Sequence, residues 1–357
     1  MLSEDSIDLG LYCSWMSDVW DNLVVDFNRY RELAANTQGI LFPLIAGSLM
    51  LPYGKAPQYR WQIRCPEMFI YLQTSNVSRQ APNVYVSMLS EALHQHGIEA
   101  LVAMARERVE TLLGTVDRIQ VSRVDLAADF LLPEGLSHSF LYSHLVPSHR
   151  KLQSISLNQN LETFYVGAKS SPIQMRIYDK AKEILTSSYK TWFGSLWGLE
   201  TIADVWRVEF QLRRPVLREL QINTLEEFLE KRASIWKYLT EEWASLRLPD
   251  DSNTTRRTVH PFWKAVQEAG SSWGDATKMQ RVKSPPTFDL DRKIAVILGH
   301  LIALAALLGV LEIREVFGFL EKLLPQNPKF HEFSELVRIK MIQLGLTPPR
   351  RGGPSCS

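Results

Sequence analysis

The chain has 357 residues, of which 45% are hydrophobic, so it is long enough to bury a large core and to form about two domains. Its 40 basic and 39 acidic residues leave a net charge of +1, which excludes a global positive field as the basis of nucleic-acid binding. Three cysteines without metal-like spacing favour a reducing compartment: Cys13, Cys65 and Cys356. The acidic start MLSEDSIDLG lacks an early apolar run, so we expect no export signal and a cytoplasmic location.

The first half of the chain predicts an antiparallel sheet. We expect residues 1–55 to form an N-terminal segment that is partly helical. The runs YRWQIR, MFIYLQ and NVYVSML are β-rich and are separated by proline and asparagine, which predicts three short strands. Apolar residues then recur near helical spacing from Ala100 to Leu112. Further strands are predicted at IQVSRVDLAADF, ETFYVGA, IQMRIYDK and VWRVEFQL, so residues 56–215 are expected to form an α+β domain.

The second half of the chain predicts helices. Thr224 and Glu227 have the spacing of a capping box ahead of an amphipathic run. Residues 249–292 are polar and interrupted by prolines, apart from the short piece HPFWKAV, and are interpreted as a linker or a long excursion. Helices are predicted again over residues 294–344. We therefore expect residues 216–345 to form a helical C-terminal region for specificity or dimerisation. Residues 346–357 are expected to be a disordered tail.

One apolar segment, Ile294–Val310, is close to the length that spans a bilayer. It contains His300 and two glycines, and the helical pattern continues into LEIREVFGFLEKLL without a polar stop. These features favour a buried helix of a helical domain. The alternative is a membrane-attached protein, which would fractionate with membranes after a salt wash.

Three of the predicted strands carry polar residues at every second position. Because side chains alternate across a strand, RVDLAADF places Arg123, Asp125 and Asp129 on one face and apolar residues on the other. The strands QMRIYDK and WRVEFQLR repeat this asymmetry, with the polar residues Arg176, Tyr178 and Lys180, and Arg207, Glu209, Gln211 and Arg213. If the three strands are neighbours, they form one surface with carboxylates, guanidinium groups, a lysine and a phenol.

Such a surface is suited to phosphoryl transfer. Two or three carboxylates without nearby His or Cys match a hard cation such as Mg²⁺ or Mn²⁺. The cation would neutralise charge on a phosphate, and the arginines would donate to its oxygens. Tyr178 would be the nucleophile, although forming a phenolate at pH 7 from a free phenol costs about 4 kcal/mol. The cation and Lys180 are neighbours that would offset this cost.

Simpler explanations exist for each residue. Arg123 and Asp125 are the types that pair across strands on a solvated face, and a single tyrosine in a strand is usually structural. A non-catalytic single-strand binder could also use this sheet, but it would need aromatic platforms on the exposed face. These three strands offer carboxylates instead, which repel nucleic acid unless a metal is present. The coincidence of three matching strands therefore favours an enzyme.

In their order and spacing, RVDLAADF, TFYVGAKSSPIQMRIYDKAKE and WRVEFQLRR resemble the replication initiation factor family. This family covers initiators of rolling-circle plasmids and phages and the related relaxases of integrative conjugative elements. The resemblance spans roughly residues 59–214, and a weaker similarity occurs at TVHPFWKAV. This chain departs from the family at NVYVSMLSEAL, where the glycine that often follows this strand is missing. The resemblance implies a bacterial enzyme that nicks one origin strand by tyrosine attack and leaves a 5′-phosphotyrosyl link and a free 3′-OH. It also implies a catalytic domain of RNA-recognition-motif-like units.

Carried over residue by residue, the resemblance implies that Tyr178 is the nucleophile. Asp125 and Glu209 fall on the metal-binding carboxylates for Mg²⁺ or Mn²⁺, and Asp129 fits a further one. The remaining motif residues look like phosphate-binding or orienting groups: Arg123, Arg176, Lys180 and Arg207. The partners implied are origin DNA, both double- and single-stranded, and a host helicase. We also expect a homodimer and no membrane partner.

Other polar clusters are weaker candidates. The His94-Gln95-His96 pair has a polar middle residue and lies where a helix is expected to end, so we do not expect a metal site there. Three further histidines are expected to be exposed: His138, His144 and His149. The local basic clusters are more simply solvated than bound to DNA: Arg106 and Arg108; Arg213, Arg214 and Arg218; Arg256 and Arg257; Lys278, Arg281 and Lys283.

Overall fold

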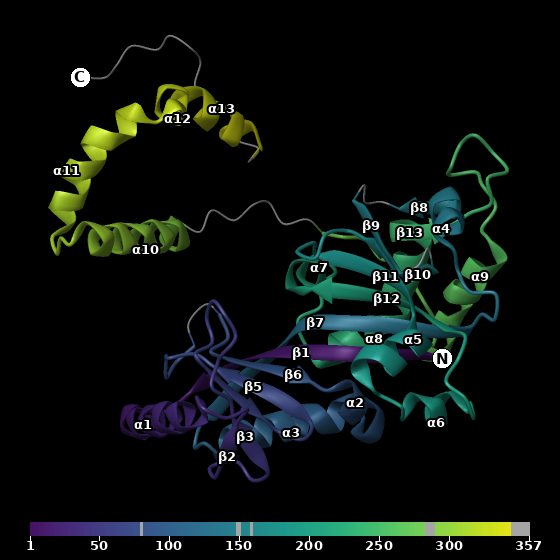
Figure 1. Cartoon of the computed structure of the whole chain (residues 1–357), viewed down its shortest axis with the longest axis horizontal. Coiled ribbons are helices and arrows are strands. Elements are labelled where there is room, and N and C mark those ends of the chain that lie inside the picture. Colours follow the sequence, from purple (N-terminus) through teal and green to yellow (C-terminus); the bar gives the residue numbers. More distant parts are fainter. Residues whose placement is uncertain (79–80, 148–150, 158–159, 283–289, 344–357) are drawn as a thin grey trace. The chain divides into compact units, whose positions relative to one another are not determined.

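A computed structural model describes residues 1–78, 81–147, 151–157, 160–282 and 290–343 (Figure 1). The chain divides into two compact units, Met1–Val282 and Lys283–Ser357. This division differs from the expected boundaries, because the N-terminal segment and the helices that directly follow residue 215 belong to the same unit as the sheet. The tail expected to be disordered lies outside the described residues.

The first unit is built on one antiparallel sheet of eleven strands in the described part of the chain. The α+β class with a helical C-terminal region is thus confirmed, and the strands predicted from the sequence all form. In spatial order the strands are β2 (Ile40–Phe42), β3 (Ser48–Met50), β4 (Trp61–Arg64), β5 (Met68–Leu72), β6 (Val84–Met88), β1 (Leu2–Ser14), β7 (Thr115–Leu131), β12 (Val205–Arg213), β11 (Ile173–Asp179), β10 (Asn160–Val166) and β9 (Leu152–Leu157).

The N-terminal segment contains the helix α1 (Ser17–Ala34), and ahead of it lies β1, a strand that was not predicted and that forms the centre of the sheet. This strand pairs with β6 on one side and with β7 on the other, and it joins the two halves of the sheet. Its sequence alternates buried apolar residues with polar or small ones: Ile7, Leu9, Leu11 and Cys13 are fully buried. Such alternation is the ordinary signature of a strand with one buried face.

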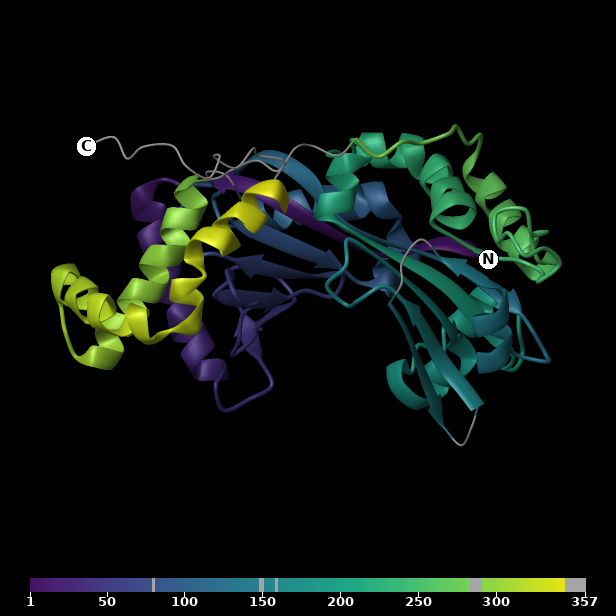
Figure 2. The same cartoon turned by 90° about the horizontal axis from the view of Figure 1, so that it is seen from above.

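Helices cover the apolar face of the sheet. Trp20 and Phe27 of α1 pack against Trp61 of β4, and Trp236 of α8 packs edge-on against Phe210 of β12. The predicted capping box of Thr224 starts α8 as expected. Figure 2 shows the helices between residues 214 and 273 aligned along one side of the strands. The helices of this face are α1 (Ser17–Ala34), α2 (Ser90–His96), α3 (Ile98–Glu110), α7 (Arg214–Glu219), α8 (Leu225–Lys237) and α9 (Pro261–Glu268).

The polar face of the sheet is partly covered at one end. After β11 the chain forms α5 (Lys180–Glu183), the π-helix Ile184–Ser188 and α6 (Phe193–Trp197). Phe193 of α6 packs on the guanidinium of Arg207, and Trp197 donates its indole N–H to Asp129. This cover decides which polar residues of the sheet remain accessible.

The second unit contains α10 (Leu290–Leu308), α11 (Ile313–Leu323), α12 (Pro328–His331) and α13 (Phe333–Gln343). The prediction that the apolar segment is a buried helix is not what the structure shows, because Ile302 is 63% and Leu307 is 86% exposed. Within the described ranges, no single helix has the length and apolar character to cross a membrane. The helices α10 and α11 meet that criterion only as a pair bent by 88°.

Candidate active site

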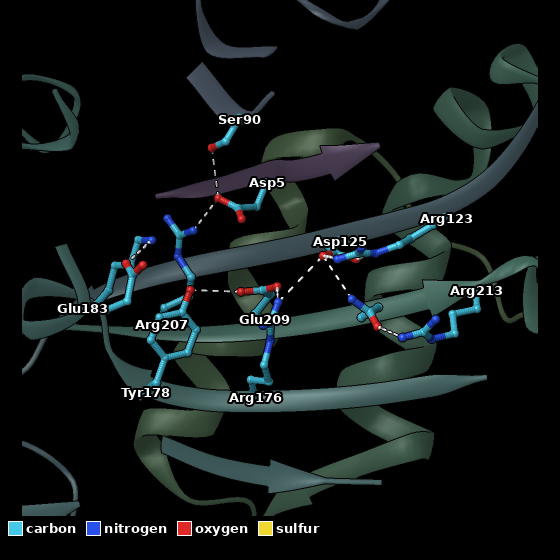
Figure 3. Close-up of polar contacts among 12 residues, drawn as sticks. Asp5, Ser90, Arg123, Asp125, Arg176, Tyr178, Glu183, Arg207, Glu209 and Arg213 are labelled. Carbon is cyan, nitrogen blue, oxygen red and sulfur yellow. Dashed lines mark hydrogen bonds and ion pairs between the residues drawn. The ribbon is translucent and has the colours of Figure 1, made fainter. Parts of the chain in front are cut away.

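The three strands with polar faces are neighbours, in the order β7, β12 and β11 (Figure 3). Residues directly opposite each other in an antiparallel pair share a face of the sheet. The register places polar residues of adjacent strands opposite each other, in the pairs Arg123–Arg213, Asp125–Gln211, Asp129–Arg207, Glu209–Arg176 and Arg207–Tyr178. The prediction that alternation gathers these groups on one surface is therefore confirmed.

This surface is largely removed from solvent. Asp125 and Glu209 are each 1% exposed. Arg123 and Asp125 do form an ion pair, in which Arg123 Nε lies 2.8 Å from Asp125 Oδ1 and a second guanidinium nitrogen contacts the other carboxylate oxygen. The pair lies within one strand, not across two, and its carboxylate is buried. The simple explanation of a solvated cross-strand pair is therefore wrong.

Tyr178 belongs to a group of five residues joined by hydrogen bonds and ion pairs, which we call the Tyr178 cluster: Arg123, Asp125, Arg176, Tyr178 and Glu209. Tyr178 Oη donates a hydrogen bond of 3.0 Å to Glu209 Oε2. The other oxygen of Glu209 contacts the guanidinium of Arg176, whose Nη2 also lies 3.7 Å from Asp125 Oδ2. Arg176 thus bridges two carboxylates that come from neighbouring strands. Its Nε finds no hydrogen-bond acceptor among the described residues.

Burial changes the acidity of two groups in this cluster. It raises the pKa of Tyr178 well above 10, and the adjacent charge of Glu209 adds to the effect, while Arg207 and Arg176 oppose it. Burial also raises the pKa of Asp125 to about 6, and the charge of Glu209 adds to this rise, while Arg123 and Arg176 oppose it. At neutral pH the tyrosine is therefore a neutral phenol, and it needs a proton acceptor to become a nucleophile.

A second cluster at the covered end of the face contains Asp5, Asp129, Trp197 and Arg207, and we call it the Arg207 cluster. Arg207 is fully buried, and its Nε and Nη2 donate to the two oxygens of Asp129 at 2.6 and 2.8 Å. Its Nη1 donates to Asp5 Oδ1 at 2.5 Å, and Asp5 accepts from the hydroxyl of Ser90. This guanidinium is held on all three nitrogens, so it has no free edge to offer a phosphate. Of the two roles expected for Arg207, phosphate binding and orientation of other groups, this geometry favours the second.

Lys180 lies near the tyrosine, although not as a strand residue. The strand ends at Asp179, whose side chain caps the next helix by accepting from the Lys182 N–H, and Lys180 is the first residue of that helix. Lys180 Nζ lies 5.7 Å from the centre of the Tyr178 ring and 2.6 Å from Glu183 Oε2. Burial and the charge of Arg207 lower the pKa of Lys180. It is a buried cation close to the phenol.

The chemistry of the donors fits a divalent metal at Asp125 and Glu209. These buried carboxylates converge on the Arg176 guanidinium, so they already share one cation, and Mg²⁺ is commonly held by only one or two protein carboxylates. Asp129 does not fit. It is four residues from Asp125 along the strand, about 13 Å away, and is bound by Arg207. No group of three or more His, Cys, Asp or Glu residues suited to a metal occurs within the described part of the chain.

Access to the tyrosine is narrow. Tyr178 is 9% exposed and lines a cavity of about 80 Å³ together with residues of β10, α5 and the π-helix, including Glu162, Thr163 and Lys182. This volume is smaller than ordinary ligand pockets, which hold ~300 Å³ or more. A ligand larger than this cavity would therefore reach the cavity side of the tyrosine only if the segment that follows β11 moved aside.

Two further carboxylates of the polar face belong to β1 and were not predicted, Asp5 and Asp8. Asp8 accepts the hydroxyl of Tyr85 at 2.7 Å and lies 3.8 Å from Arg123 Nη1, so it extends the Tyr178 cluster toward the other half of the sheet. The signal is present in IDLGLYC, where Asp8 alternates with buried apolar residues.

The remaining sequence candidates have local structural partners. His94 packs on the rings of Trp192 and Phe193, and His138 is exposed as expected. His144 contacts Phe140 and His260, and His149 lies outside the described residues. Several of the basic residues form ion pairs: Arg106 with Glu110, Arg108 with Glu67, Arg256 with Asp251, and Arg281 with Glu219. Lys283 is outside the described residues.

Comparison with known proteins gives a likeness in structure but no match in sequence. No protein-family model matches the chain, and no curated protein matches it. Among solved structures, the chain is similar to the rolling circle replication initiator protein from Geobacillus stearothermophilus, at 16% sequence identity and a TM-score of 0.43. The match covers 79% of this chain and 98% of the initiator chain.

Proposed function

We propose that the protein is a DNA-nicking and strand-transferring enzyme of the rolling-circle replication initiator type, with Tyr178 as its nucleophile. The observation that supports this proposal is the hydrogen bond from Tyr178 to Glu209, within a cluster that also holds Asp125 and two partly exposed arginines. A nucleophile, a proton acceptor and donors for phosphate oxygens are thereby within contact of one another. The setting would be the cytoplasm of a bacterium.

The proposed reaction starts with Glu209 Oε2, which takes the Tyr178 proton as Oη forms a bond to phosphorus. The bond between phosphorus and the 3′ oxygen breaks, and the departing oxygen takes a proton from water to become a free 3′-OH. The 5′ phosphate remains on Tyr178. Because the pKa of Tyr178 is far above 10, the proton leaves only as the new bond forms, so Glu209 acts as a general base.

The arginines of the Tyr178 cluster would bind the phosphate. The side chains of Arg123 and Arg176 are 30% and 29% exposed, unlike that of Arg207, and guanidinium forks suit non-bridging phosphate oxygens. A Mg²⁺ or Mn²⁺ held by Asp125 and Glu209 would supply neutralisation of phosphate charge. Arg176 now lies between these carboxylates, so a metal and a phosphate would each favour its movement out of that place.

The test is incubation with a supercoiled plasmid that carries the protein's own origin, in Mg²⁺ or Mn²⁺. We expect nicked circles with protein covalently attached to the 5′ end. Tyr178→Phe should form no adduct, whereas the matched control Tyr142→Phe, at an exposed tyrosine on α4 (His138–His144), should behave as the wild type. An adduct formed by Tyr178→Phe would exclude this nucleophile. Absence of cleavage by the wild type with every metal would reject the enzyme proposal.

A conjugative relaxase is the alternative that uses the same chemistry, and the genes next to this one distinguish the two. The proposal further includes origin DNA in double- and single-stranded form, a host helicase and a homodimer. Oligomeric state is measurable by light scattering.

The argument against a non-catalytic single-strand binder is that β7, β11 and β12 offer carboxylates instead of aromatic platforms. That argument covers these three strands alone, because β5 and β6 of the same sheet do carry aromatic side chains.

A further inference from the structure

The polar face of the sheet continues past β7 onto strands that carry aromatic side chains. Phe69 and Tyr71 of β5 and Tyr85 of β6 form what we call the aromatic row. Tyr71 is directly opposite Tyr85 in the strand register, and their ring centres are 6.2 Å apart. The ring centre of Phe69 lies 6.3 Å from that of Tyr71. Ile70 and Val86, on the same strands, point to the opposite face and are fully buried. Phe69 and Tyr85 are half-buried and Tyr71 is 9% exposed, with the Lys55 ammonium over the rings of Tyr71 and Tyr85, so a base reaches these two rings only when Lys55 moves.

The aromatic row and the Tyr178 cluster are parts of one surface. Tyr85 donates to Asp8, Asp8 lies within 3.8 Å of Arg123, and Arg123 binds Asp125. Two strand steps separate β6 from β7, which corresponds to about 10 Å. A strand of DNA that leaves the Tyr178 cluster across the sheet therefore reaches these rings within a few nucleotides.

Positive charge accompanies the rings. Lys55 Nζ lies 4.0 Å from the centre of the Tyr85 ring and 4.7 Å from that of Tyr71. Burial lowers the pKa of Lys55, Asp8 opposes this change, and the nearby charges of Arg123 and Arg213 add to it. Aromatic platforms interleaved with cations are the usual means by which proteins hold unpaired nucleotides, because bases stack on rings and phosphates bind the cations.

We propose that the aromatic row, with Lys55, is a binding site for unpaired nucleotides of the DNA strand that enters the Tyr178 cluster. This inference rests on the proposed nicking function, since it assigns the strand next to the scissile phosphate. The occupant is single-stranded DNA, because the bases of a duplex are stacked on each other and cannot lie flat on a sheet. In the structure, the Lys55 ammonium lies over the rings of Tyr71 and Tyr85. In the proposed complex with DNA, a base stacks on these rings instead, and the ammonium moves to bind the adjacent phosphate.

The test is binding of a short, labelled, thymidine-rich oligonucleotide to the full-length protein, measured by fluorescence anisotropy. Tyr85→Leu should weaken single-strand binding by about tenfold, which is typical for removal of one base–aromatic stack. Tyr85→Phe keeps the ring and removes only the hydrogen bond to Asp8, so its affinity should stay within about twofold. Tyr142→Leu, at an exposed tyrosine on α4, is the matched control and should bind as the wild type.

The salt dependence separates the ring from the lysine. For single strands, the slope of log affinity against log salt becomes shallower by about 0.7 for each phosphate that the protein no longer binds. Lys55→Gln should show this change in slope, whereas Tyr85→Leu should keep the wild-type slope. Circular dichroism and thermal melting of each variant verify that it is folded. If Tyr85→Phe binds as weakly as Tyr85→Leu, or if folded Tyr85→Leu binds like the wild type, the stacking site is rejected.

A covalent probe locates the bound base independently of affinity. Irradiation of a 5-iodouracil oligonucleotide links it to aromatic side chains that touch the base, and peptide mass spectrometry identifies the residue. We expect cross-links at Tyr71 or Tyr85, and cross-links confined to other regions would overturn the assignment. Binding and cross-linking need no cleavage, so failure of nicking and failure of the aromatic row are distinguishable. Normal cross-links in a wild-type protein that never nicks reject the nicking function alone, whereas cross-links elsewhere in a protein that nicks reject the aromatic row alone.

Discussion

Two clusters on one face of the sheet are made from the same residue types, yet they have different properties. In the Arg207 cluster, one fully buried guanidinium makes three hydrogen bonds to Asp5 and Asp129 under the cover of α6. In the Tyr178 cluster, Arg123 and Arg176 retain 30% and 29% of their side-chain exposure, and Arg176 has a nitrogen without an acceptor among the described residues. The first arrangement is complete by itself, whereas the second has donors left for a ligand.

The difference teaches that residue type and strand position do not define a catalytic role. Asp125, Asp129, Arg207 and Glu209 look equivalent in the sequence, since each belongs to a polar strand face. The number of partners already bound, and the cover above them, separates a structural ion pair from a candidate site. A buried ion pair of the first kind is costly to break, because the remaining charges stay desolvated.

The largest effect should follow from removal of the buried guanidinium. Arg207→Met leaves Asp5 and Asp129 without their partner inside the protein, and we expect a decrease of about 3–5 kcal/mol in the free energy of unfolding. Arg176→Met removes the ion-pair partner of the buried Glu209, but Asp125 keeps Arg123, so this variant should cost less, about 1–3 kcal/mol. Urea unfolding followed by circular dichroism measures both. Equal decreases in the two variants would contradict the distinction between the clusters.

A smaller effect should appear in metal affinity, measured by Mn²⁺ electron paramagnetic resonance. Asp125→Asn and Glu209→Gln each remove a proposed ligand and should weaken Mn²⁺ binding by at least about tenfold. Asp129→Asn should leave the affinity unchanged, because that carboxylate is bound by Arg207. Arg176→Gln should tighten binding, since it removes the competing cation. Weakening by folded Asp129→Asn as large as that by Asp125→Asn would place Asp129 back among the ligands.

The sequence predicted the strands and the composition of their polar face, because alternation is local information. It did not predict that β1 lies between β6 and β7, since pairing between distant segments depends on the whole sheet. Nor could it show that Phe193 and Trp197 close over Arg207 and Asp129, which changes their role. Lys180 was expected on a strand, but Asp179 caps a helix at that point.

The prediction that the C-terminal apolar segment forms a buried helix failed for a related reason. The segment is helical, as its composition indicated. Its hydrophobicity shows that burial of the helix would be favourable, but it does not show which surface would bury it. Tyr71 and Tyr85 likewise alternate with core residues in β5 and β6, so the sequence of these strands shows which face each tyrosine occupies. Their connection to Arg123 through Asp8 required the position of β1.

The smallest expected effect distinguishes the two clusters by pH. Burial raises the pKa of Asp5, but Arg207, Lys180 and Lys190 outweigh it and hold that pKa well below its usual range. Asp5 therefore stabilises the fold above about pH 4, and this contribution is lost as the pH falls. Asp125 has the opposite sign: its pKa is raised to about 6, so the folded state is most favoured below about pH 4 and loses stability as the pH rises through 6.

Melting temperatures between pH 4 and pH 8 test this contrast. In Asp125→Asn, the decline in melting temperature on going from pH 4 to pH 7 should be smaller than in the wild type by about 2–4 °C. In Asp5→Asn, the deficit relative to the wild type should be nearly constant between about pH 5 and pH 8 and should shrink only below about pH 4, so this variant is also melted at pH 2 to 4. The same titration of Asp125 predicts that Mn²⁺ affinity rises through pH 6, because a protonated carboxyl is a poor ligand. Parallel pH profiles for the two variants would show that both carboxylates have the same electrostatic environment. The distinction between the Arg207 cluster, whose donors are all bound, and the Tyr178 cluster, which has donors left for a ligand, would then fail.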